Sequence, residues 1–509
     1  MHFFGLVNLV FLFLSMHILL LQTGLCNNDN EEMLPRIGIV GAGLGGTSCA
    51  FYLRQLLGSK ATIDIFEASK VGGRTAVIKI NGQKFEAGGS VIHNQNKYMV
   101  DFAEKFNKKR LSRSDSIFGL YSNGDIVFET SRWTAVTLSK LLWRYGLDAY
   151  KIHDWTKNFL SKKFNRIYEF QDGGMAFTTV EDMLRAMGDE LLNMTHSSLK
   201  DVLLDIGVSE KFIDELAQGV MRNNYGQSTG VHGLVGAVSL IGAEPGLWSV
   251  ENGNKEISEA LLQESKANFI EANVKTVTLY KDELGTGSIS YEVDYENQNE
   301  KSESTGTREY DIVILAAPLE GTKFKIAFTD FPGPMPPFSQ KFHTTVAMFV
   351  LGKVNTTTFH LDNPDDFPAD LFTSQPDSFF NSIGKLSPVD TAQPEHAYEP
   401  GQAVWKTFLN KNPNQEEISS LFESREDLRL VDWLAYPEYA PNMKLPPFQL
   451  YDRLYYINAI ESAASAMEMA VIGSRNVAFL AYNQWFGHFD KIDEIHLQTP
   501  SADNKNSEL

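Results

Sequence analysis

The sequence predicts an α/β protein in which a discontinuous, doubly wound domain is interleaved with an α+β domain. Two observations predict it. A glycine-rich turn joins an apolar strand to a helix near residue 41, a pattern typical of the first βαβ unit of a doubly wound sheet. Strands and a helix suited to the same sheet recur near residues 275, 312 and 465, so the long stretches between them form the second domain.

Length, charge and cysteine content exclude several classes of function. The chain has 509 residues and carries 45 basic and 64 acidic side chains, a net charge of −19. An acidic protein repels polyphosphate, which argues against a nucleic-acid partner. The 2 cysteines exclude a disulfide scaffold and a metal site built from several cysteines. At roughly 150 residues per domain, the length allows two or three domains.

The N-terminal segment predicts entry into the secretory pathway. Residues 3–25 carry no formal charge and are rich in Phe, Leu, Ile and Val, and a polar run begins at Asn27. We expect a signal peptide over residues 1–26, cleaved after Cys26. The segment lacks a basic residue and approaches the ~18 residues that can span a bilayer, so a retained anchor is the alternative. After cleavage no stable transmembrane span is expected. Asn193 and Asn355 begin N-x-Thr triplets, which predict N-glycans.

Residues 36–67 hold a complete dinucleotide-binding fingerprint. An apolar strand over residues 36–40 runs into the turn Gly41-Ala-Gly43-Leu-Gly45-Gly46. A helix over residues 47–57 and a strand over residues 61–66 follow, and 20 residues separate Gly46 from Glu67. This order of strand, glycine turn, helix, strand and acid predicts a bound dinucleotide.

Each of these residue types has a physical reason. Gly41 permits the tight turn, Gly43 lets the backbone approach a pyrophosphate, and Gly46 allows close contact between helix and strand. The start of the helix offers unpaired N–H groups to the phosphates. Glu67 can accept hydrogen bonds from both ribose hydroxyls and would repel the 2′-phosphate of NADP.

The residues after this unit favour FAD over NAD. Val71-Gly-Gly73-Arg74-Thr75 is followed by a run from Gly82 to Ser90 that contains Glu86-Ala-Gly88-Gly89-Ser90. This pair of runs resembles the second signature of the FAD-dependent, amine-oxidase-like flavoproteins. The resemblance implies that Gly73 and Arg74 lie near the pyrophosphate. It also implies that Gly88, Gly89 and Ser90 bring backbone against the flavin ring, where side chains would clash.

Two distant segments complete the FAD-binding, Rossmann-like domain that the resemblance implies. Residues 273–277 are expected as an edge strand on which Val274 lines the adenine, and residues 310–318 as a buried strand. Residues 457–464 precede a helix, and there Glu461 is placed for a ribitol hydroxyl while Ala464 lets the helix start approach the flavin. We therefore assign residues 33–95, 246–330 and 452–488 to the FAD-binding domain, 96–245 and 331–451 to the substrate domain, and 489–509 to a polar tail.

The substrate domain is expected to combine helices with a sheet. Residues 132–150 and 180–192 are amphipathic, and residues 342–351 and 403–409 resemble strands. Residues 281–311 are expected to form an exposed hairpin. Aromatic side chains are frequent in the helical part, and we expect most of them in the helix core: Trp133, Trp143, Trp155, Phe159 and Phe164.

Several longer runs resemble the prenylcysteine oxidases, FAD-dependent thioether oxidases of the lysosome. These runs cover residues 221–229, 236–254, 460–469 and 480–485. The resemblance implies oxidative cleavage of farnesyl- or geranylgeranyl-cysteine to cysteine, a prenyl aldehyde and hydrogen peroxide, with O₂ as acceptor. It also implies a lysosomal location, with secretion as the alternative. A flavin amine oxidase and a non-enzymatic prenyl-binding, escort-like protein remain as rival hypotheses.

The candidates for polar work at the flavin face are His93, three residues past Ser90, and four residues of the first of these runs: Arg222, Asn224, Tyr225 and Gln227. His93 could lie near the flavin ring, and Arg222 could hold the substrate carboxylate. We find no Ser/His/Asp set, and no metal site is expected. This fits hydride removal from an allylic S–CH₂ carbon, in which the cofactor carries the chemistry and the protein positions the substrate.

Overall fold

Two β-sheets organise the part of the chain that the computed structural model describes. The described residues are 34–112, 116–242, 245–281, 289–298, 304–320, 325–336 and 340–494. From Arg36 onward they belong to one compact unit. The predicted signal peptide and residues 495–509 of the polar tail lie outside the described residues.

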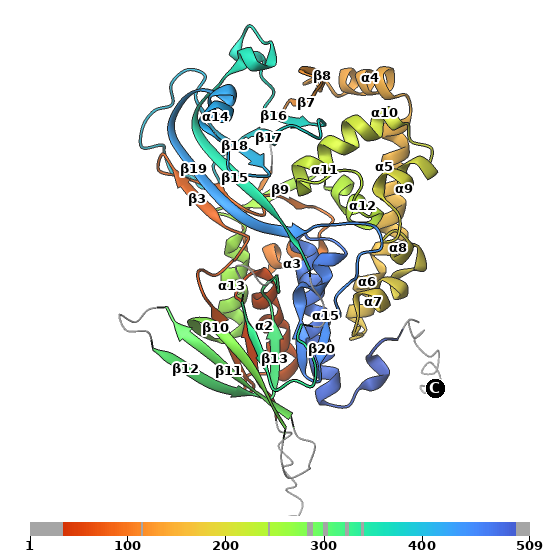
Figure 1. Cartoon of the computed structure of the whole chain (residues 1–509), viewed down its shortest axis with the longest axis vertical. Helices are drawn as coiled ribbons and strands as arrows, with labels where there is room; N and C mark the ends of the chain where they lie inside the picture. Colours follow the sequence, from red (N-terminus) through yellow and green to blue (C-terminus); the bar gives the residue numbers. More distant parts are fainter. Residues whose placement is uncertain are drawn as a thin grey trace, which may run out of the picture. The chain divides into compact units, whose positions relative to one another are not determined.

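The first sheet confirms the predicted doubly wound domain, and its strands come from three separated parts of the chain (Figure 1). Along the sheet the strands are β12 (Thr305–Tyr310), β11 (Ile289–Asn297), β10 (Asn268–Lys281), β2 (Thr62–Glu67), β1 (Arg36–Val40), β13 (Ile312–Leu315), β21 (Leu454–Tyr456) and β20 (Gln449–Tyr451), and β14 (Ala327–Thr329) pairs with β10. The five from β10 to β21 are parallel, and β11, β12 and β20 join antiparallel.

Three helices pack beside this sheet and against one another. The first is α2 (Leu44–Leu57), which contacts α13 (Lys255–Ser265) and α15 (Met467–Trp485). Buried parallel strands carry apolar side chains on both faces, and Ile37 and Ile39 of β1 are fully buried. Residues 273–277, expected as an edge strand, lie within β10, where they pair with β11 and, from Thr276 onward, also with β14. The hairpin expected over residues 281–311 forms with β11 and β12, although Tyr291 and Val293 of β11 are buried rather than exposed.

The second sheet belongs to the part expected to bind substrate. Its order is β19 (Phe422–Pro437), β15 (Phe342–Val354), β18 (Ala403–Leu409), β17 (Phe380–Lys385), β16 (Asp370–Thr373), β7 (Phe118–Ser122) and β8 (Asp125–Glu129). The strands expected over residues 342–351 and 403–409 are β15 and β18. Successive residues of a strand point to opposite faces, and on β15 both faces are apolar. Val346, Met348 and Val350 join one core cluster, and Ala347 and Phe349 join another.

Two short sheets connect the larger ones. One pairs β3 (Val77–Ile80) with β4 (Gln83–Glu86), and the other places β9 (Leu247–Val250) between β5 (Ile92–His93) and β6 (Arg110–Ser112). Helix α3 (Lys97–Lys105) follows β5, and α14 (Gln415–Leu421) precedes β19. Strand β4 leads directly into Gly88 and Gly89, so the small sheets position the second glycine motif.

A layer of helices completes the substrate part. It contains α4 (Thr134–Tyr145), α5 (Asp148–Phe159), a π-helical turn (Leu160–Phe164), α6 (Arg166–Asp172), α7 (Val180–Met187), α8 (Asp189–Asn193), α9 (Leu199–Asp205), α10 (Glu210–Phe212), α11 (Gln218–Tyr225) and α12 (Gly233–Ile241). Gly146 at φ +60° and Gly188 at φ +150° divide the two amphipathic stretches into helix pairs. None of the described helices is both long and apolar enough for a membrane crossing.

The expectation that most aromatics of this layer belong to the helix core is only partly correct. Phe159 and Phe164 are buried, and Trp155 is half-buried. By contrast, Trp133 and Trp143 are 75% and 87% exposed. Periodicity alone does not reveal which side of a helix meets the protein, and α4 turns its aromatic side outward.

Candidate functional site

A cavity of about 1720 Å³ joins the two sheets and collects most of the predicted site residues. A site for one drug-sized ligand occupies roughly 300–1,000 Å³, so this cavity has room for a cofactor together with a substrate. The predicted residues on its wall are Gly41, Gly43, Gly45, Glu67, Gly73, Arg74, Gly88, Gly89, Ser90, His93, Asn224, Tyr225 and Glu461.

The glycine turn at one end of the cavity has the geometry that the fingerprint predicts. Gly41 adopts φ +109°, and a Cβ there would lie 2.8 Å from the carbonyl oxygen of Ala316. A Cβ on Gly46 would lie 1.9 Å from the carbonyl oxygen of Gly41, so Gly46 faces the turn rather than the cavity. A Cβ on Gly43 meets nothing nearer than 3.9 Å. The backbone at Gly43 is therefore open to a ligand, and α2 begins at the next residue.

Glu67 lies beside this turn at the end of β2. Its carboxylate accepts hydrogen bonds from the backbone N–H of Ala42 and of Ser69, each at 2.8 Å. Burial raises the pKa of Glu67, although these N–H donors oppose the shift. The bonds fix the carboxylate at the mouth of the glycine turn, where the ribose of a dinucleotide is expected.

The second glycine motif folds back on the first. The Gly72 N–H donates to the carbonyl of Ala42 at 2.9 Å, and the Gly89 N–H donates to the carbonyl of Arg74 at 2.9 Å. A Cβ on Gly88 would lie 1.9 Å from that same Arg74 oxygen. Gly88 is thus required by backbone packing, whereas Gly89 borders the cavity next to Met467.

On the cavity wall, Arg74 of the second glycine motif forms an ion pair with Glu461, which lies in the turn before α15. The Arg74 side chain is 34% exposed and that of Glu461 only 4%. Burial lowers the pKa of Arg74, but the charge and hydrogen bonds of Glu461 outweigh burial and raise it. Asn458 Nδ2 also donates to Glu461 Oε1 at 2.7 Å. Arg74 places a cation where the diphosphate of FAD is expected, and Glu461 places carboxylate acceptors where the ribitol is expected. The residues therefore fit that cofactor.

Two runs of the sequence, Glu86–Ser90 and Glu251–Asn254, interlock at the cavity wall. Asn254 Nδ2 donates to the carbonyl of Gly89 at 2.9 Å, and the Asn254 N–H donates to Glu86 Oε1 at 2.6 Å. Asn252 adopts φ +71° in the turn before it, a conformation that asparagine tolerates. The second run therefore supports the first.

A buried cation that was not among the predicted site residues also lines the cavity. Lys406 of β18 is 5% exposed, and its Nζ donates to Ser90 Oγ at 2.9 Å. The ammonium also lies 4.6 Å from the ring centre of Phe408. The pattern that indicates this cation in the sequence is a single lysine in the mostly apolar run Val404-Trp-Lys406-Thr-Phe408. A lysine is rarely buried without a function or a partner.

Glu86 is the second titratable group of this wall. Burial raises its pKa to about 8, against the opposing effects of the Asn254 N–H and the Lys406 charge. Its Oε2 is buried without a hydrogen-bond partner among the described residues. Glu86 is therefore neutral over much of the pH range below 8.

Aromatic and aliphatic side chains line the other end of the cavity. They come from three separated parts of the chain, namely α5 with the π-helical turn after it, α12 and β16: Phe159, Phe164, Val238, Ile241 and Phe372. Trp433 and Tyr436 of β19 lie nearer the centre, and Trp433 Nε1 donates to the carbonyl of Ala87 at 3.2 Å. An apolar end next to a polar centre suits a ligand with a hydrocarbon tail and a charged head.

The polar candidates on the wall have protein partners of their own. His93 Nε2 lies 3.1 Å from the carbonyl of Pro245, and its Nδ1 accepts from the Gln95 N–H at 3.2 Å. Asn224 Nδ2 donates to Ser239 Oγ at 3.0 Å. The Tyr225 hydroxyl donates to the carbonyl of Ser465 at 2.9 Å, and burial raises its pKa. These contacts hold the side chains in place on the cavity wall.

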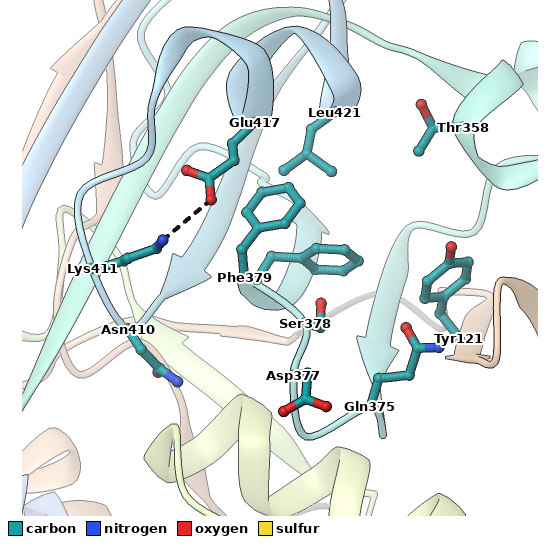
Figure 2. Close-up of a pocket in the computed structure, with 11 residues that line it drawn as sticks. Tyr121, Thr358, Gln375, Asp377, Ser378, Phe379, Asn410, Lys411, Glu417 and Leu421 are labelled. Carbon is teal, nitrogen blue, oxygen red and sulfur yellow. Dashed lines mark ion pairs between the residues drawn. The ribbon is translucent and has the colours of Figure 1, made fainter.

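The structure does not bring Arg222 to the cavity. Its guanidinium donates to three backbone carbonyls, those of Pro376, Ser378 and Phe380, each at 3.0 Å. These carbonyls belong to a segment that lines a separate, smaller pocket of about 670 Å³. Figure 2 shows this pocket, with Asp377 and Ser378 on that segment and Lys411 paired with Glu417. The expectation that Arg222 holds a substrate carboxylate is corrected, since its donors stabilise this segment.

Three further predicted residues also lie off the cavity wall. Gln227 bridges the carbonyl of Pro437 and the N–H of Tyr439, at 3.0 and 2.9 Å. Val274 is buried in β10, and from that part of the chain Phe269 and Glu271 reach the wall instead. Ala464 is fully buried, one residue before Ser465, which lines the cavity. Within the described ranges, no group of three or more His, Cys, Asp or Glu side chains is arranged to hold a metal ion.

Comparisons with known proteins agree with this geometry. A sequence profile of the prenylcysteine lyase family matches residues 128–494, and a profile of NAD(P)-binding Rossmann-like domains matches residues 39–106. Human prenylcysteine oxidase 1 is 41% identical over 491 residues, which cover 94% of this chain and 95% of that protein. Prenylcysteine oxidase 1-like from Bos taurus is 35% identical over 466 residues, covering 91% and 93%.

The solved structures add a likeness of fold alone. A double mutant of putrescine oxidase aligns with a TM-score of 0.55 at 13% identity and covers 88% of this chain and 99% of its own. The sequence relationship is much closer, because the family profile matches residues 128–494 and the human relative is 41% identical over 94% of the chain. The chain therefore belongs to the prenylcysteine lyase family.

Proposed function

We propose that the protein is a prenylcysteine oxidase. It uses FAD and O₂ to cleave the thioether of farnesyl- or geranylgeranyl-cysteine, giving cysteine, a prenyl aldehyde and hydrogen peroxide. The observation that carries the proposal is the 41% identity to human prenylcysteine oxidase 1 across nearly the whole of both chains. The cavity supports it, because one end suits a dinucleotide and the other a hydrocarbon chain.

The dinucleotide end supplies the residues that would hold FAD. The start of α2 and the open backbone at Gly43 would hold the diphosphate, and Glu67 would accept from the adenosine ribose. Arg74 would hold the diphosphate as well, and Glu461 would accept from the ribitol. When bound, FAD supplies the two-electron oxidation of the carbon next to sulfur and transfers those electrons to O₂.

The opposite end would hold the substrate. Phe159, Phe164 and Phe372 enclose the isoprenoid and exclude water from it. The Lys406 ammonium, between the two ends, is suited to pair with the substrate carboxylate. This arrangement orients the S–CH₂ carbon toward Gly89 and Ser90. One water enters the overall reaction: the thioether, O₂ and H₂O give aldehyde, thiol and H₂O₂.

The test is anaerobic mixing of the purified holoprotein with farnesylcysteine. We expect the absorbance of oxidised flavin to bleach and to return with O₂, with peroxide released in equal amount. Putrescine and benzylamine serve as controls. Bleaching by an amine but not by farnesylcysteine would identify an amine oxidase, and a colourless protein that still binds farnesylcysteine would identify a prenyl-binding protein. A Lys406→Met variant should raise KM for farnesylcysteine at least about tenfold, since it removes a charge-assisted bond.

We further propose that the protein acts in the lysosome after passage through the secretory pathway, or is secreted. The apolar segment over residues 3–25 and the triplets at Asn193 and Asn355 support this route. Asn193 is exposed on α8, and Asn355 is half-buried with Nδ2 at 3.3 Å from the carbonyl of Ser419. Mass determination of the protein from a eukaryotic host, before and after glycosidase treatment, should give a mature N-terminus after Cys26 and at least one glycan. An intact N-terminus without glycan would contradict the proposal.

A further inference from the structure

Exposed apolar side chains concentrate on one short stretch of the helical layer. Seven of the thirteen exposed large apolar side chains of the described residues lie between residues 133 and 150. We call them the α4 face: Trp133, Val136, Leu138, Leu142, Trp143, Leu147 and Tyr150. Such a concentration of exposed apolar side chains within 18 residues indicates an interaction site.

Helix α4 is anchored through Tyr145, on the side of the helix that faces away from Trp143. Tyr145 is the single buried residue among its twelve. The Tyr145 hydroxyl donates to Glu215 at 2.8 Å, and Arg144 pairs with the same carboxylate at 2.8 Å. The Tyr145 ring packs on Phe212 and Phe128. The helix is thus firmly anchored, and the outward direction of its tryptophans is fixed by that anchor.

The sequence segment that carries the α4 face is basic although the whole chain is acidic, and of its basic residues Arg144 and Lys163 pair with carboxylates outside the segment. Residues 131–165 contain seven basic and two acidic side chains, a local net charge of +5 in a chain of net charge −19. Arg132 and Lys140 are exposed beside the two tryptophans. Basic side chains flanking Trp and Leu on a helix are typical of binding in the interface of an anionic lipid bilayer. A second copy is a poorer partner, because it would bring the same positive charge against this one.

The α4 face is also close to the apolar end of the cavity. Helix α5 begins two residues after Gly146, and its last residue, Phe159, lines the cavity together with Phe164. Twelve residues at 1.5 Å per residue span about 18 Å. In Figure 1, α4 lies at the margin of the structure beside β8, and α5 runs from it along the helical layer.

We propose that the α4 face docks the protein on the surface of an anionic lipid bilayer. Trp133 and Trp143 enter the interface, and Arg132 and Lys140 face the lipid phosphates. The docked protein would place the apolar end of its cavity near the membrane, from which a lipid-like substrate can enter. This last step rests on the proposed function, whereas the docking does not.

The test uses the holoprotein and lipid vesicles without substrate. Sedimentation with vesicles of phosphatidylcholine containing one-third phosphatidylserine should retain the wild type, and a Trp133→Ser/Trp143→Ser variant should bind at least about tenfold more weakly. A matched variant, Tyr280→Ser/Phe489→Ser, removes two exposed aromatics elsewhere and should bind like the wild type. An Arg132→Glu/Lys140→Glu variant should lose the preference for phosphatidylserine. Tryptophan fluorescence of the wild type should shift to the blue on binding.

Several outcomes would overturn the proposal. These are no binding of the wild type to the vesicles that contain phosphatidylserine, equal binding of the tryptophan variant, or a dimer in solution that the tryptophan variant dissociates. Failure of the proposed function gives a different result. Vesicle binding that depends on Trp133 and Trp143, without oxidation of farnesylcysteine in vesicle-free solution, would remove that function and leave the docking intact.

Discussion

The two ends of the cavity are built in different ways. At the dinucleotide end, Gly41, Gly43 and Glu67 come from one continuous βαβ unit, and backbone geometry determines which residue type each position accepts. At the substrate end, Phe159, Ile241 and Phe372 come from separate helices and strands, and any apolar side chain of similar volume would serve.

This difference determines what each end tolerates. A close backbone contact leaves no room for even one methyl group, whereas a wall of side chains can repack. Substitutions at the dinucleotide end should therefore cost stability and cofactor together. Substitutions at the substrate end should change affinity for the substrate while the fold survives.

The largest effect is expected at Gly46. In a Gly46→Ala variant the new methyl group would lie 1.9 Å from the carbonyl oxygen of Gly41, so the turn and α2 must separate. We expect a loss of about 3 kcal/mol in unfolding free energy and no retained flavin. Chemical denaturation and the ratio of flavin to protein absorbance measure both.

Gly333 provides the control for that substitution. A Cβ there meets no atom within 4 Å, and its φ is not positive. Gly333→Ala should leave the unfolding free energy within about 0.5 kcal/mol of the wild type and the flavin content unchanged. Equal behaviour of the two alanine variants would mean that the close packing of the glycine turn is not what holds the cofactor end together.

The next effect concerns the ion pair of Arg74 and Glu461. An Arg74→Met variant leaves the Glu461 carboxylate, 4% exposed, without its cation, and we expect a loss of about 3 kcal/mol. Adding Glu461→Gln removes the stranded charge, so the double variant should be more stable than the sum of the two single losses predicts. A double-mutant cycle by thermal or chemical unfolding measures this coupling. Additive losses would show that the pair contributes nothing to the folded state.

A pH-dependent effect is expected at Glu86. Its folded pKa, about 8, lies above the ordinary value of 4.5, so the folded state keeps a proton that the unfolded state loses as the pH rises from about 4.5 to 8. Stability contributed by this group is therefore present at acidic pH and lost toward pH 8. A Glu86→Gln variant should gain on the wild type by roughly 2–4 kcal/mol between pH 5 and pH 8.

The control for this prediction is the exposed carboxylate of Glu395, which lies 3.6 Å from Lys79 and is 61% exposed. The difference between Glu395→Gln and the wild type should stay constant between pH 5 and pH 8. Melting temperatures over this range provide the measurement. A constant difference for Glu86→Gln as well would place the Glu86 titration outside this range.

The difference between sites built from local backbone geometry and sites built from distant side chains also explains what the sequence could predict. The fingerprint residues from Gly41 to Glu67 act through local geometry, so their spacing alone located them and the doubly wound fold. By contrast, the hydrogen bonds between Glu86–Ser90 and Glu251–Asn254 form only on folding. Asn254 donates to the carbonyl of Gly89, which lies 165 residues earlier in the sequence. Nothing in the local pattern of either run indicates that contact.

The residues that contact the substrate could not be predicted from the sequence, because a residue in a run typical of the family need not lie at the cavity. Arg222 and Gln227 lie in a distinctive run, yet both bond to backbone groups away from the cavity. Lys406 interrupts an apolar strand, and this pattern in the sequence indicates a buried cation. Trp133 and Trp143 have helical spacing, which does not distinguish a side packed on the protein from one facing outward.

The smallest effect, and the sharpest test of the substrate end, compares Arg222 with Asn224. Arg222→Lys retains the charge but cannot donate to three carbonyls in the same geometry, so we expect a loss of about 1–2 kcal/mol in unfolding free energy. KM for farnesylcysteine should stay within about twofold, because the side chain does not reach the cavity.

Asn224→Ala removes a polar group from the wall and should raise KM while changing stability by less than about 1 kcal/mol. The reverse pattern, with KM raised by Arg222→Lys at unchanged stability, would return the substrate carboxylate to Arg222. It would also mean that the segment over residues 376–380 moves when substrate binds, since the three carbonyls now hold that guanidinium away from the cavity.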